Sequence, residues 1–433
     1  MFTIGCMLLA FNGTLPPIVF TPDEQRRILQ HSPVPPPPDD PTNEWDHNKH
    51  AAQLGQSLFF DAGFSSNGQI SCASCHGPMI AFTDGVPISE GLTTGTRHSP
   101  SLLNVSHQRW FFWDGRADTL WSQALHPIES AHEFGSTHNA YVFRLTQTPP
   151  YREAYERLFG PLPDMSDHER FPLDAKEGSP SWDAMTSQDQ HAVNEAIANC
   201  GKAIAAYETR LQSTESDFDV FAEGLREQDP QKLGALTHSA QRGLKLFIGQ
   251  AGCRQCHSGP LFTDFEFHNI GIPTGHGGPA QDSGRHGGIA HVQRSPFSAH
   301  GPFSDEPSGR RARRTRSTIQ SPEHWGAFKT PSLRNLTRTA PYMHQGQFAS
   351  IEDVLAYYNT LEDMQVQDHH QESVLQPLDL TDEQLADLEA FLRSLDSPLP
   401  PRSLMGPVDP RTGKPPQKPK NAGGPTLESE KQP

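Results

Sequence analysis

Hydrophobic and polar positions repeat with helical spacing in several stretches of the chain. The stretch 47–60, HNKHAAQLGQSLFF, has apolar residues every three to four positions and predicts an amphipathic helix that ends before the turn-rich DAGFSSNGQ. The same spacing predicts helices at 191–211 and 381–395, and in SAQRGLKLFIGQ, where Leu244, Leu246 and Phe247 form the stripe. A further helix is predicted at 350–361, with Ser350 as its N-cap. The predicted protein is mainly α-helical.

The order of these patterns predicts two related units. Each unit has a helix, then a short loop, then the sequence C-x-x-C-H. We expect an N-terminal domain at 43–183 and a C-terminal domain at 184–398, because charged loops around 160–185 separate them. The helix at 191–211 would bridge the units or begin the second one.

Composition predicts irregular segments outside and between these helices. The proline-rich HSPVPPPPDDPTNEW predicts that residues 1–42 are a leader remnant and a linker, and residues 399–433 are expected to be a disordered tail. The Gly-, Ser- and Arg-rich stretch 274–320 predicts a long surface loop. RRARRTR at 310–316 is then either a solvated part of that loop or a docking patch for an acidic protein.

Charge and hydropathy exclude two classes of protein. The formal net charge is -16, and one short basic cluster is too little to bind a phosphate backbone, so a nucleic-acid partner is not expected. No stretch approaches the 18 or so apolar residues that a membrane span requires.

Four of the six cysteines stand in the two C-x-x-C-H motifs, SCASCHGP and GCRQCHSGP. Two thiols at this spacing can bond to the two vinyl groups of one haem, and the adjacent histidine can then ligate its iron. The sequence therefore predicts two covalently bound c-type haems, held by Cys72, Cys75 and His76 and by Cys253, Cys256 and His257.

Other uses of the motifs explain the residues less well. A closed zinc site needs a fourth ligand, and no further Cys pair lies nearby. A thioredoxin-like redox pair leaves the histidine after each motif without a role. The two remaining cysteines have no assigned chemistry: Cys6 lies near the N-terminus, and Cys200 lies in a helix pattern and is expected to be a buried small hydrophobe.

Covalent haem attachment also predicts the compartment. The N-terminal MFTIGCMLLAF is apolar, but it lacks the basic lead and the clear cleavage site of a signal peptide. Because bacterial c-type attachment follows export, we nevertheless expect a periplasmic protein.

Five segments together resemble the bacterial di-haem cytochrome c peroxidase and MauG family: LGQSLFFD, SCASCHGP, RWFFWDGRADTLWSQALHPIESAHEFG, LFIGQAGCRQCHSGPLFTD and FKTPSLRNLTRTAPYMHQGQF. The resemblance covers roughly residues 43–398. It implies two cytochrome c-like domains that face each other, each with one haem.

The resemblance also implies roles for single residues. His76 would be the proximal ligand of the peroxide-reactive haem and His257 that of the electron-transfer haem. Trp113 would lie between the haems and carry electrons across, although it could also be an ordinary core aromatic. Glu133 would be the acid of the distal pocket, which Gln123 and Pro127 would also line; an isolated glutamate would otherwise be a solvated side chain.

The chain departs from the ordinary peroxidase pattern at the first haem. In ordinary members a loop histidine about sixteen residues after the proximal one caps the reactive iron. Glu90 stands at that place here, and the nearest histidines, His98 and His107, lie further along. We therefore expect an iron that is open without reductive activation, with His98 as a possible displaced cap.

A second departure concerns the far ligand of the C-terminal haem. Tyr358 lies fourteen residues beyond His344, where ordinary peroxidases have methionine and MauG has tyrosine. A phenolate favours the higher oxidation states of iron, whereas a thioether favours the ferrous form. Tyr357 and Tyr358 could instead pack a helix face, and Met343 is the competing ligand in another segment.

The family's calcium site is the third point of comparison. Its asparagine corresponds to His98, and Thr339 and Pro341 could offer carbonyl oxygens. The resemblance thus implies a calcium ion, but His98 argues against it because imidazole is a poor ligand for a hard cation.

The resulting hypothesis is a MauG-type di-haem peroxidase that reacts with hydrogen peroxide and oxidises a partner protein. Two alternatives stay open. The protein could be a cytochrome c peroxidase that uses a small cytochrome or copper protein as electron donor, or an electron-transfer cytochrome without catalysis.

Overall fold

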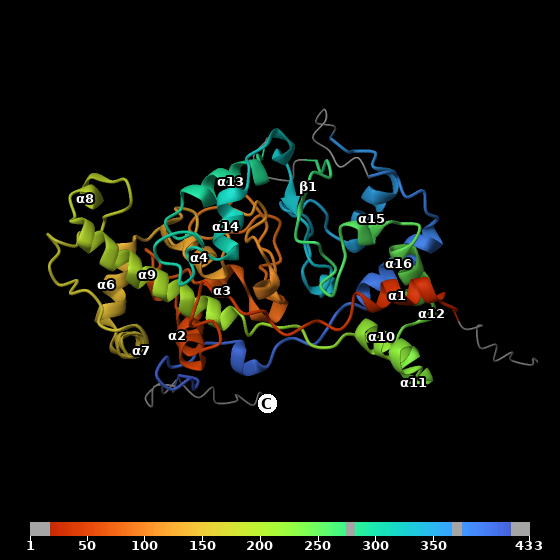
Figure 1. Ribbon diagram of the computed structural model, residues 1–433, viewed down its shortest axis with the longest axis horizontal. Helices are drawn as coiled ribbons and strands as arrows, with labels where there is room; N and C mark the ends of the chain where they lie inside the picture. Colours follow the sequence, from red (N-terminus) through yellow and green to blue (C-terminus); the bar gives the residue numbers. More distant parts are fainter. Residues whose placement is uncertain (1–17, 274–281, 366–374, 417–433) are drawn as a thin grey trace, which may run out of the picture.

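The computed structural model describes residues 18–273, 282–365 and 375–416, and it shows two helical lobes side by side (Figure 1). The predicted mainly helical fold is confirmed. The only sheet in these ranges pairs β1 (Phe267–His268) with β2 (Phe328–Lys329) in antiparallel register. No described helix is long and apolar enough to span a membrane.

All five predicted helices are present. They are α2 (Lys49–Phe60), α9 (Ser187–Glu208), α12 (His238–Ile248), α15 (Ile351–Thr360) and α16 (Asp382–Arg393). The predicted N-cap is also confirmed, since the Ser350 hydroxyl accepts a hydrogen bond from the backbone N–H of Asp353 at 3.1 Å. The remaining helices are α1 (Pro22–Leu29), α3 (Cys72–Cys75), α4 (Leu120–Gln123), α5 (His126–Glu129), α6 (His138–Gln147), α7 (Pro149–Phe159), α8 (Pro180–Asp183), α10 (Asp217–Glu227), α11 (Pro230–Leu233), α13 (Arg285–Arg294) and α14 (Arg310–Ser317).

Each lobe is organised around one close helix crossing. In the N-terminal lobe α2 crosses α9, and a Cβ on Gly55 would lie only 1.8 Å from the carbonyl oxygen of Ala203. In the C-terminal lobe α12 crosses α16, and a Cβ on Gly243 would lie 1.9 Å from the carbonyl oxygen of Asp387. Glycine is required at both places because no side chain fits between the two backbones. Since α2 and α12 each precede a C-x-x-C-H motif, the two lobes are built alike.

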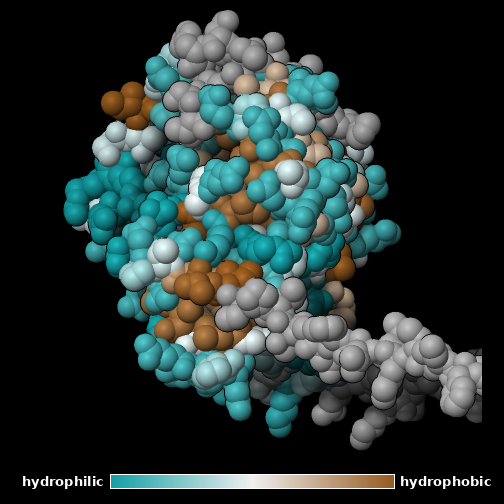
Figure 2. All heavy atoms as spheres, turned by 90° about the vertical axis from the view of Figure 1, so that its right-hand side faces the viewer, coloured by the Kyte–Doolittle hydropathy of each residue, from teal (hydrophilic) through white to brown (hydrophobic). Residues whose placement is uncertain are grey.

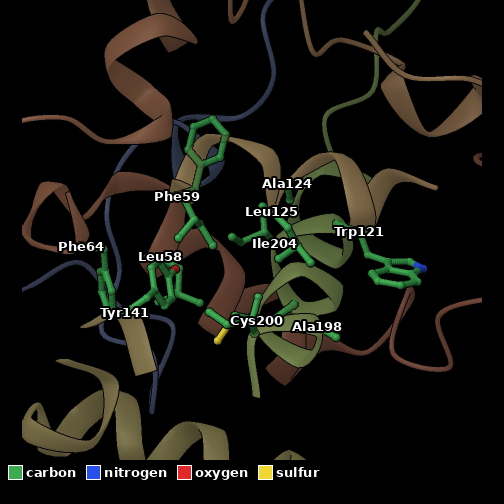
Figure 3. Packing of buried hydrophobic residues seen from close by; sticks show 14 of the residues in the cluster. Leu58, Phe59, Phe64, Trp121, Ala124, Leu125, Tyr141, Ala198, Cys200 and Ile204 are labelled. Atoms are coloured by element: carbon green, nitrogen blue, oxygen red, sulfur yellow. The ribbon is translucent and has the colours of Figure 1, made fainter. Parts of the chain in front are cut away.

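Large side chains from α2, α4, α6 and α9 fill the core of the N-terminal lobe (Figure 3). Phe59, Trp121 and Tyr141 are completely or almost completely buried there. Cys200 lies on α9 within the same cluster with no exposed surface, so the prediction of a buried small hydrophobe is confirmed. Cys6 lies outside the described residues.

The C-terminal lobe has its own core around α12 and α16. Phe247, Phe262 and Phe391 pack edge to face or tilted in it, with ring centroids 5.1 to 6.0 Å apart. On the outer face of this lobe hydrophobic residues gather in two groups surrounded by hydrophilic ones (Figure 2).

The N-terminal core extends past the predicted domain boundary at residue 183. Just before the boundary, Phe171 and Trp182 lie in this core, although their segment is rich in charged loops. The whole of α9 packs on α2 and α4, and Leu211 is still in the same cluster, whereas Phe218 of α10 belongs to the other core. Helix α9 therefore completes the first lobe and does not begin the second, because its apolar face has its partners there.

Both ends of the described chain are folded, in contrast to the predicted linker and tail. Helix α1 buries Ile28 in the C-terminal core, beside α12 (Figure 1). At the other end, Ser57 donates to the carbonyl of Val408 and Tyr207 donates to the carbonyl of Leu404 at 2.6 Å. These partners lie far away in sequence, so local composition did not reveal them. Residues 417–433 of the predicted tail lie outside the described residues.

The predicted long loop at 274–320 contains two helices, α13 and α14. Buried Asp118 holds α14 and the segment that follows α13 on the N-terminal lobe: its carboxylate accepts from the backbone N–H of Ala299 at 2.9 Å and from the hydroxyl of Thr315 at 2.6 Å. RRARRTR is therefore helical and not part of a loop; a buried tertiary contact outweighs the composition of the segment.

Candidate functional site

The two C-x-x-C-H motifs adopt the same local structure. The backbone N–H of His76 donates to the carbonyl of Cys72, and that of His257 donates to the carbonyl of Cys253, both at 2.9 Å. One turn of helix therefore brings each histidine back next to its two cysteines. The four cysteines of the motifs are half-buried and form no disulfide bond.

A backbone carbonyl orients each of the two histidines. His76 Nδ1 lies 2.9 Å from the carbonyl oxygen of Phe82, and His257 Nδ1 lies 2.9 Å from that of Phe262. An Nδ1 that donates here leaves Nε2 unprotonated, with its lone pair free for a metal. Burial also lowers the pKa of both rings and so favours the neutral form. Each site thus offers two thiols and one available imidazole nitrogen, which fits a covalently attached haem.

The segments that follow the motifs repeat as well. SPSLLN at 99–104 and TPSLRN at 330–335 have the same bonds: Ser101 donates to the carbonyl of Ala81 at 2.6 Å, and Ser332 donates to that of Leu261 at 2.7 Å. Asn104 and Asn335 both have left-handed backbone, with φ of 60° and 64°. The two segments therefore have the same local structure relative to their motifs.

The repeat pairs further residues of the two lobes. Counting from these asparagines with the same offset of 231, Trp113 corresponds to His344, and Pro127 corresponds to Tyr358. Both members of the second pair lie in helices: Pro127 is in α5 and Tyr358 is in α15. At the position where the second lobe has a phenol, the first lobe has a side chain with no donor atom.

The first cavity is lined by Cys72, Cys75 and His76 on one side and by Gln123, Pro127 and Glu133 on another. The structure thus brings together the residues predicted for this site. The Oε1 atom of Gln123 is buried and has no hydrogen-bond partner among the described residues. Burial raises the pKa of Glu133, although Arg116 and the Ser130 hydroxyl favour its charged form. This cavity therefore holds an unsatisfied acceptor and a carboxyl group that keeps its proton more readily than usual.

Neither Glu90 nor the two nearby histidines is placed as a cap in this structure, although His98 lines the cavity. Glu90 is exposed. His98 has its Nδ1 2.7 Å from the carbonyl oxygen of Val86 and its Nε2 3.4 Å from the hydroxyl of Thr83, next to the carbonyl that holds His76. His107 lies 3.2 Å from the side chain of Gln212. Because both ring nitrogens of His98 have partners on the His76 side, it does not serve as a displaced cap in this structure.

Two adjoining hollows, which together we call the second cavity, share Cys253, His257, Met343 and Tyr358, and Cys256 lines one of them. The two adjacent tyrosines differ. The Tyr357 hydroxyl donates to the carbonyl of Ile270 at 2.6 Å, whereas Tyr358 lines the cavity. Burial raises the pKa of Tyr358 well above its usual value, so a phenolate there needs a cation beside it.

Trp113 lies between the two cavities and lines both. Its Nε1–H donates to the carbonyl of His98 at 2.9 Å, and its ring centroid lies 6.5 Å from that of His344. Its own carbonyl accepts from the backbone N–H of Lys329 at 2.8 Å, which joins the two lobes. This residue is therefore fixed in orientation at the seam.

Thr339 and Pro341 line the second cavity together with His98. The ring of His98 is engaged in hydrogen bonds, as described above. Among the described residues the one cluster of three His, Cys, Asp or Glu ligands is Cys256, Asp264 and His268; it shares Cys256 with the second motif and includes neither Thr339 nor Pro341. Calcium at Thr339 and Pro341 stays a prediction of the resemblance.

Two buried ionisable residues were not predicted. Glu208 lies at the end of α9 on the wall of the first cavity, with Oε2 unpartnered among the described residues, and burial raises its pKa to about 8. Lys329 donates to the carbonyl of Trp110 at 2.8 Å and to the side chain of Gln108, and burial lowers its pKa to about 7. Helical spacing puts Glu208 on the apolar face of 191–211, and this position was the signal that could have indicated its burial.

Comparison with known proteins shows the family of this chain. The family model described as di-haem cytochrome c peroxidase matches residues 49–227. The methylamine utilization protein MauG of Methylorubrum extorquens is 32% identical over 79% of this chain and 77% of its own length. This chain belongs to the di-haem cytochrome c peroxidase and MauG family. It is therefore a haem-dependent oxidoreductase, and the family implies haem c as its cofactor.

Relatives of both functional kinds are similar to this chain. The cytochrome-c peroxidase IdrP1 of Denitromonas iodatirespirans is 31% identical over 84% of this chain and 85% of its own length. Among solved structures, a MauG-like protein associated with microbial copper homeostasis has a TM-score of 0.60 and 25% identity, covering 88% of this chain and 97% of that one. The di-haem peroxidase BthA from Burkholderia thailandensis shares the fold, with a TM-score of 0.61 at 23% identity over 86% of this chain and 92% of its own.

Proposed function

We propose that this protein is a MauG-type di-haem peroxidase that reacts with hydrogen peroxide at the N-terminal site and draws electrons from a partner protein through the C-terminal site. The observation that carries this proposal is the pairing of Pro127 with Tyr358 in the internal repeat. The side chain of proline has no atom that can ligate a metal, so the first site keeps one face open for peroxide, whereas a phenol is available at the second.

Two cytochrome c-like lobes would each hold one haem. Cys72 and Cys75 would form the thioether bonds of the first, with His76 as ligand, and Cys253, Cys256 and His257 would hold the second. When bound, haem iron supplies the electrons that cleave the O–O bond of peroxide and stores the oxidising equivalents.

Glu133 would move a proton between the two oxygens of peroxide. Its raised pKa lets it accept a proton from the near oxygen and return it to the departing one, as general acid-base catalysis requires. Gln123 would position the molecule, since its buried Oε1 needs a donor and a peroxide O–H can provide one. Pro127 would complete the wall without adding a competing ligand.

Trp113 would carry electrons between the two sites. It lines both cavities and is held by the hydrogen bond to His98, so its ring keeps one orientation. Tyr358 would ligate the second iron as a phenolate, because the cation beside it offsets the effect of burial on its pKa. The second site would thus share the oxidising equivalents. Because haem is attached after export, we place the protein in the periplasm.

A cytochrome c peroxidase that uses a small cytochrome or copper protein is the second candidate, and the likeness to IdrP1 favours it. The two functions differ in whether the reactive site must first be reduced. Stopped-flow mixing of the fully oxidised di-haem protein with hydrogen peroxide distinguishes them. The MauG-type function predicts rapid spectral change without a reductant; a reaction that needs prior one-electron reduction contradicts it.

A further inference from the structure

Helix α14, with the sequence RRARRTRS, has charges that oppose its own formation. Arg310 and Arg311 stand in its first turn, where the helix dipole disfavours positive charge, and no acidic residue accompanies them. Arg310, Arg313 and Arg314 are spaced so that like charges meet on one face, which costs about 0.2–0.5 kcal/mol per pair. A helix whose charges disfavour its own formation indicates that these charges have a function.

The N-terminal lobe holds this helix in place. Ala312 and Thr315 are its buried residues, and the Thr315 hydroxyl donates to the buried carboxylate of Asp118. Arg311 turns inward as well, donating to the carbonyl of Asp118 at 2.7 Å, with its Nε 3.8 Å from Asp40. The helix is therefore a fixed part of the surface, and Arg310, Arg313 and Arg316 are left exposed on it.

The outward arginines have no acidic partners. Arg310, Arg313 and Arg316 are exposed, and among the described residues none of them, nor Arg314, forms an ion pair with a carboxylate. Arg313 donates to the carbonyl of Ser308, and Arg316 donates to the carbonyls of Pro307 and His300. In a chain with a net charge of -16, this face is an uncompensated positive region, which we name the arginine face.

The arginine face adjoins exposed apolar side chains and the second cavity. Ile319 and Trp325 follow α14 with exposed fractions of 76% and 36%. The carbonyl of Trp325 accepts from Asn269 at 3.1 Å, and Asn269 lines the second cavity. Helix α13 contacts both α14 and the turn at Pro322–His324, so these parts are neighbours that pack on the same helix.

We propose that the arginine face, with Ile319 and Trp325, is the docking surface for an acidic protein that supplies electrons to the second site. This inference rests on the proposed function for the role of the partner, but the binding itself does not. Arginine and tryptophan beside exposed apolar groups are typical of protein interfaces.

The test compares two double variants of the di-haem protein with equal changes in charge. Arg310→Glu/Arg313→Glu alters the arginine face, and Arg152→Glu/Arg157→Glu alters two exposed arginines on α7. The probes are an acidic copper protein of the plastocyanin class, a basic mitochondrial cytochrome c and vesicles of phosphatidylglycerol. Dissociation constants are measured by surface plasmon resonance at about 20 and 200 mM salt, and peroxide reactivity without a partner is measured separately.

We expect the acidic protein to bind more tightly than the basic one, and to bind about tenfold more weakly to Arg310→Glu/Arg313→Glu, with less than a twofold change in the α7 variant. At about 200 mM salt most of this difference in dissociation constant should disappear. Equal effects of the two variants, no binding of the acidic protein, or a preference for vesicles would each overturn the docking proposal. Binding as expected in a protein that does not react with peroxide would instead contradict the proposed function alone. Arg310→Gln/Arg313→Gln, with half the change in charge, should give an intermediate dissociation constant, and this checks the result if the glutamate variant folds poorly.

Discussion

Asn104 and Asn335 donate to the same atom, Ser213 Oγ, each at 2.8 Å. One asparagine follows the N-terminal motif and the other follows the C-terminal motif, and both are buried. Ser213 lies in the connection between α9 of the first lobe and α10 of the second. The two repeats therefore meet at a single hydroxyl group, which fixes how the lobes are joined.

Replacing this hydroxyl should destabilise the whole protein. In Ser213→Ala two buried amide N–H groups lose their acceptor, which should lower the free energy of unfolding by about 2–4 kcal/mol. Urea titration followed by circular dichroism measures the change. Ser308→Ala, at an exposed position, is the control and should change it by less than about 0.5 kcal/mol. Equal effects of the two substitutions would show that Ser213 does not join the lobes.

Glu133→Gln should slow the reaction with peroxide. Glutamine keeps the shape of the side chain but cannot accept and return a proton, so the second-order rate constant should fall by about 10²- to 10⁴-fold. Glu90→Gln, in the exposed loop beside the same cavity, should leave it unchanged. Stopped-flow spectroscopy of the di-haem protein measures both. A Glu133 variant that reacts at the original rate would remove this residue from the mechanism.

Glu208 should make stability depend on pH. Its folded pKa of about 8 lies above the ordinary value of 4.5, so the folded state holds the proton more tightly than the unfolded state does. This contribution is fully present below pH 4.5 and is lost as pH rises to about 8, at most about 1.4 kcal/mol per pH unit.

In Glu208→Gln that loss disappears, so the variant should gain stability relative to the original protein at each step from pH 5 to pH 8. Urea unfolding at four pH values measures the difference. The exposed Glu169→Gln should show a flat difference over the same range. A flat difference for Glu208→Gln as well would mean that this carboxyl group is not buried as the structure has it.

Tyr358→Met should raise the reduction potential of one haem. A thioether favours the ferrous form, whereas a phenolate favours the ferric form. Spectroelectrochemical titration should show one potential shifted upward and the other nearly unchanged. Tyr357→Phe is the matched control, because the Tyr357 hydroxyl is bound to the carbonyl of Ile270. Potentials that stay the same in Tyr358→Met, or that shift equally in both variants, would exclude Tyr358 as the ligand.

The sequence was most informative where local pattern and chemistry coincide. Helices α2 and α12 and the two motifs could be predicted because helical spacing and the C-x-x-C-H sequence are both local signals. Helix α14 could not, because its stability comes from buried Asp118, which lies far away in sequence. The folded ends were missed for the same reason, since Ile28 and Leu404 find their partners in distant helices.

The residues of the candidate site also divide into those that could be predicted from the sequence and those that could not. The resemblance brought Gln123, Pro127 and Glu133 together, and the structure places them on one cavity. Glu208 was missed, because a glutamate at the end of an amphipathic helix is normally solvated, and only the packing of α9 buries it.

Electron paramagnetic resonance of the fully oxidised di-haem protein tests the central claim most directly. An open face at Pro127 and a phenol at Tyr358 predict one high-spin and one low-spin ferric signal of equal intensity. Two low-spin signals would mean that the protein seals both irons, and two high-spin signals would mean that Tyr358 does not bind. Either result would contradict the account.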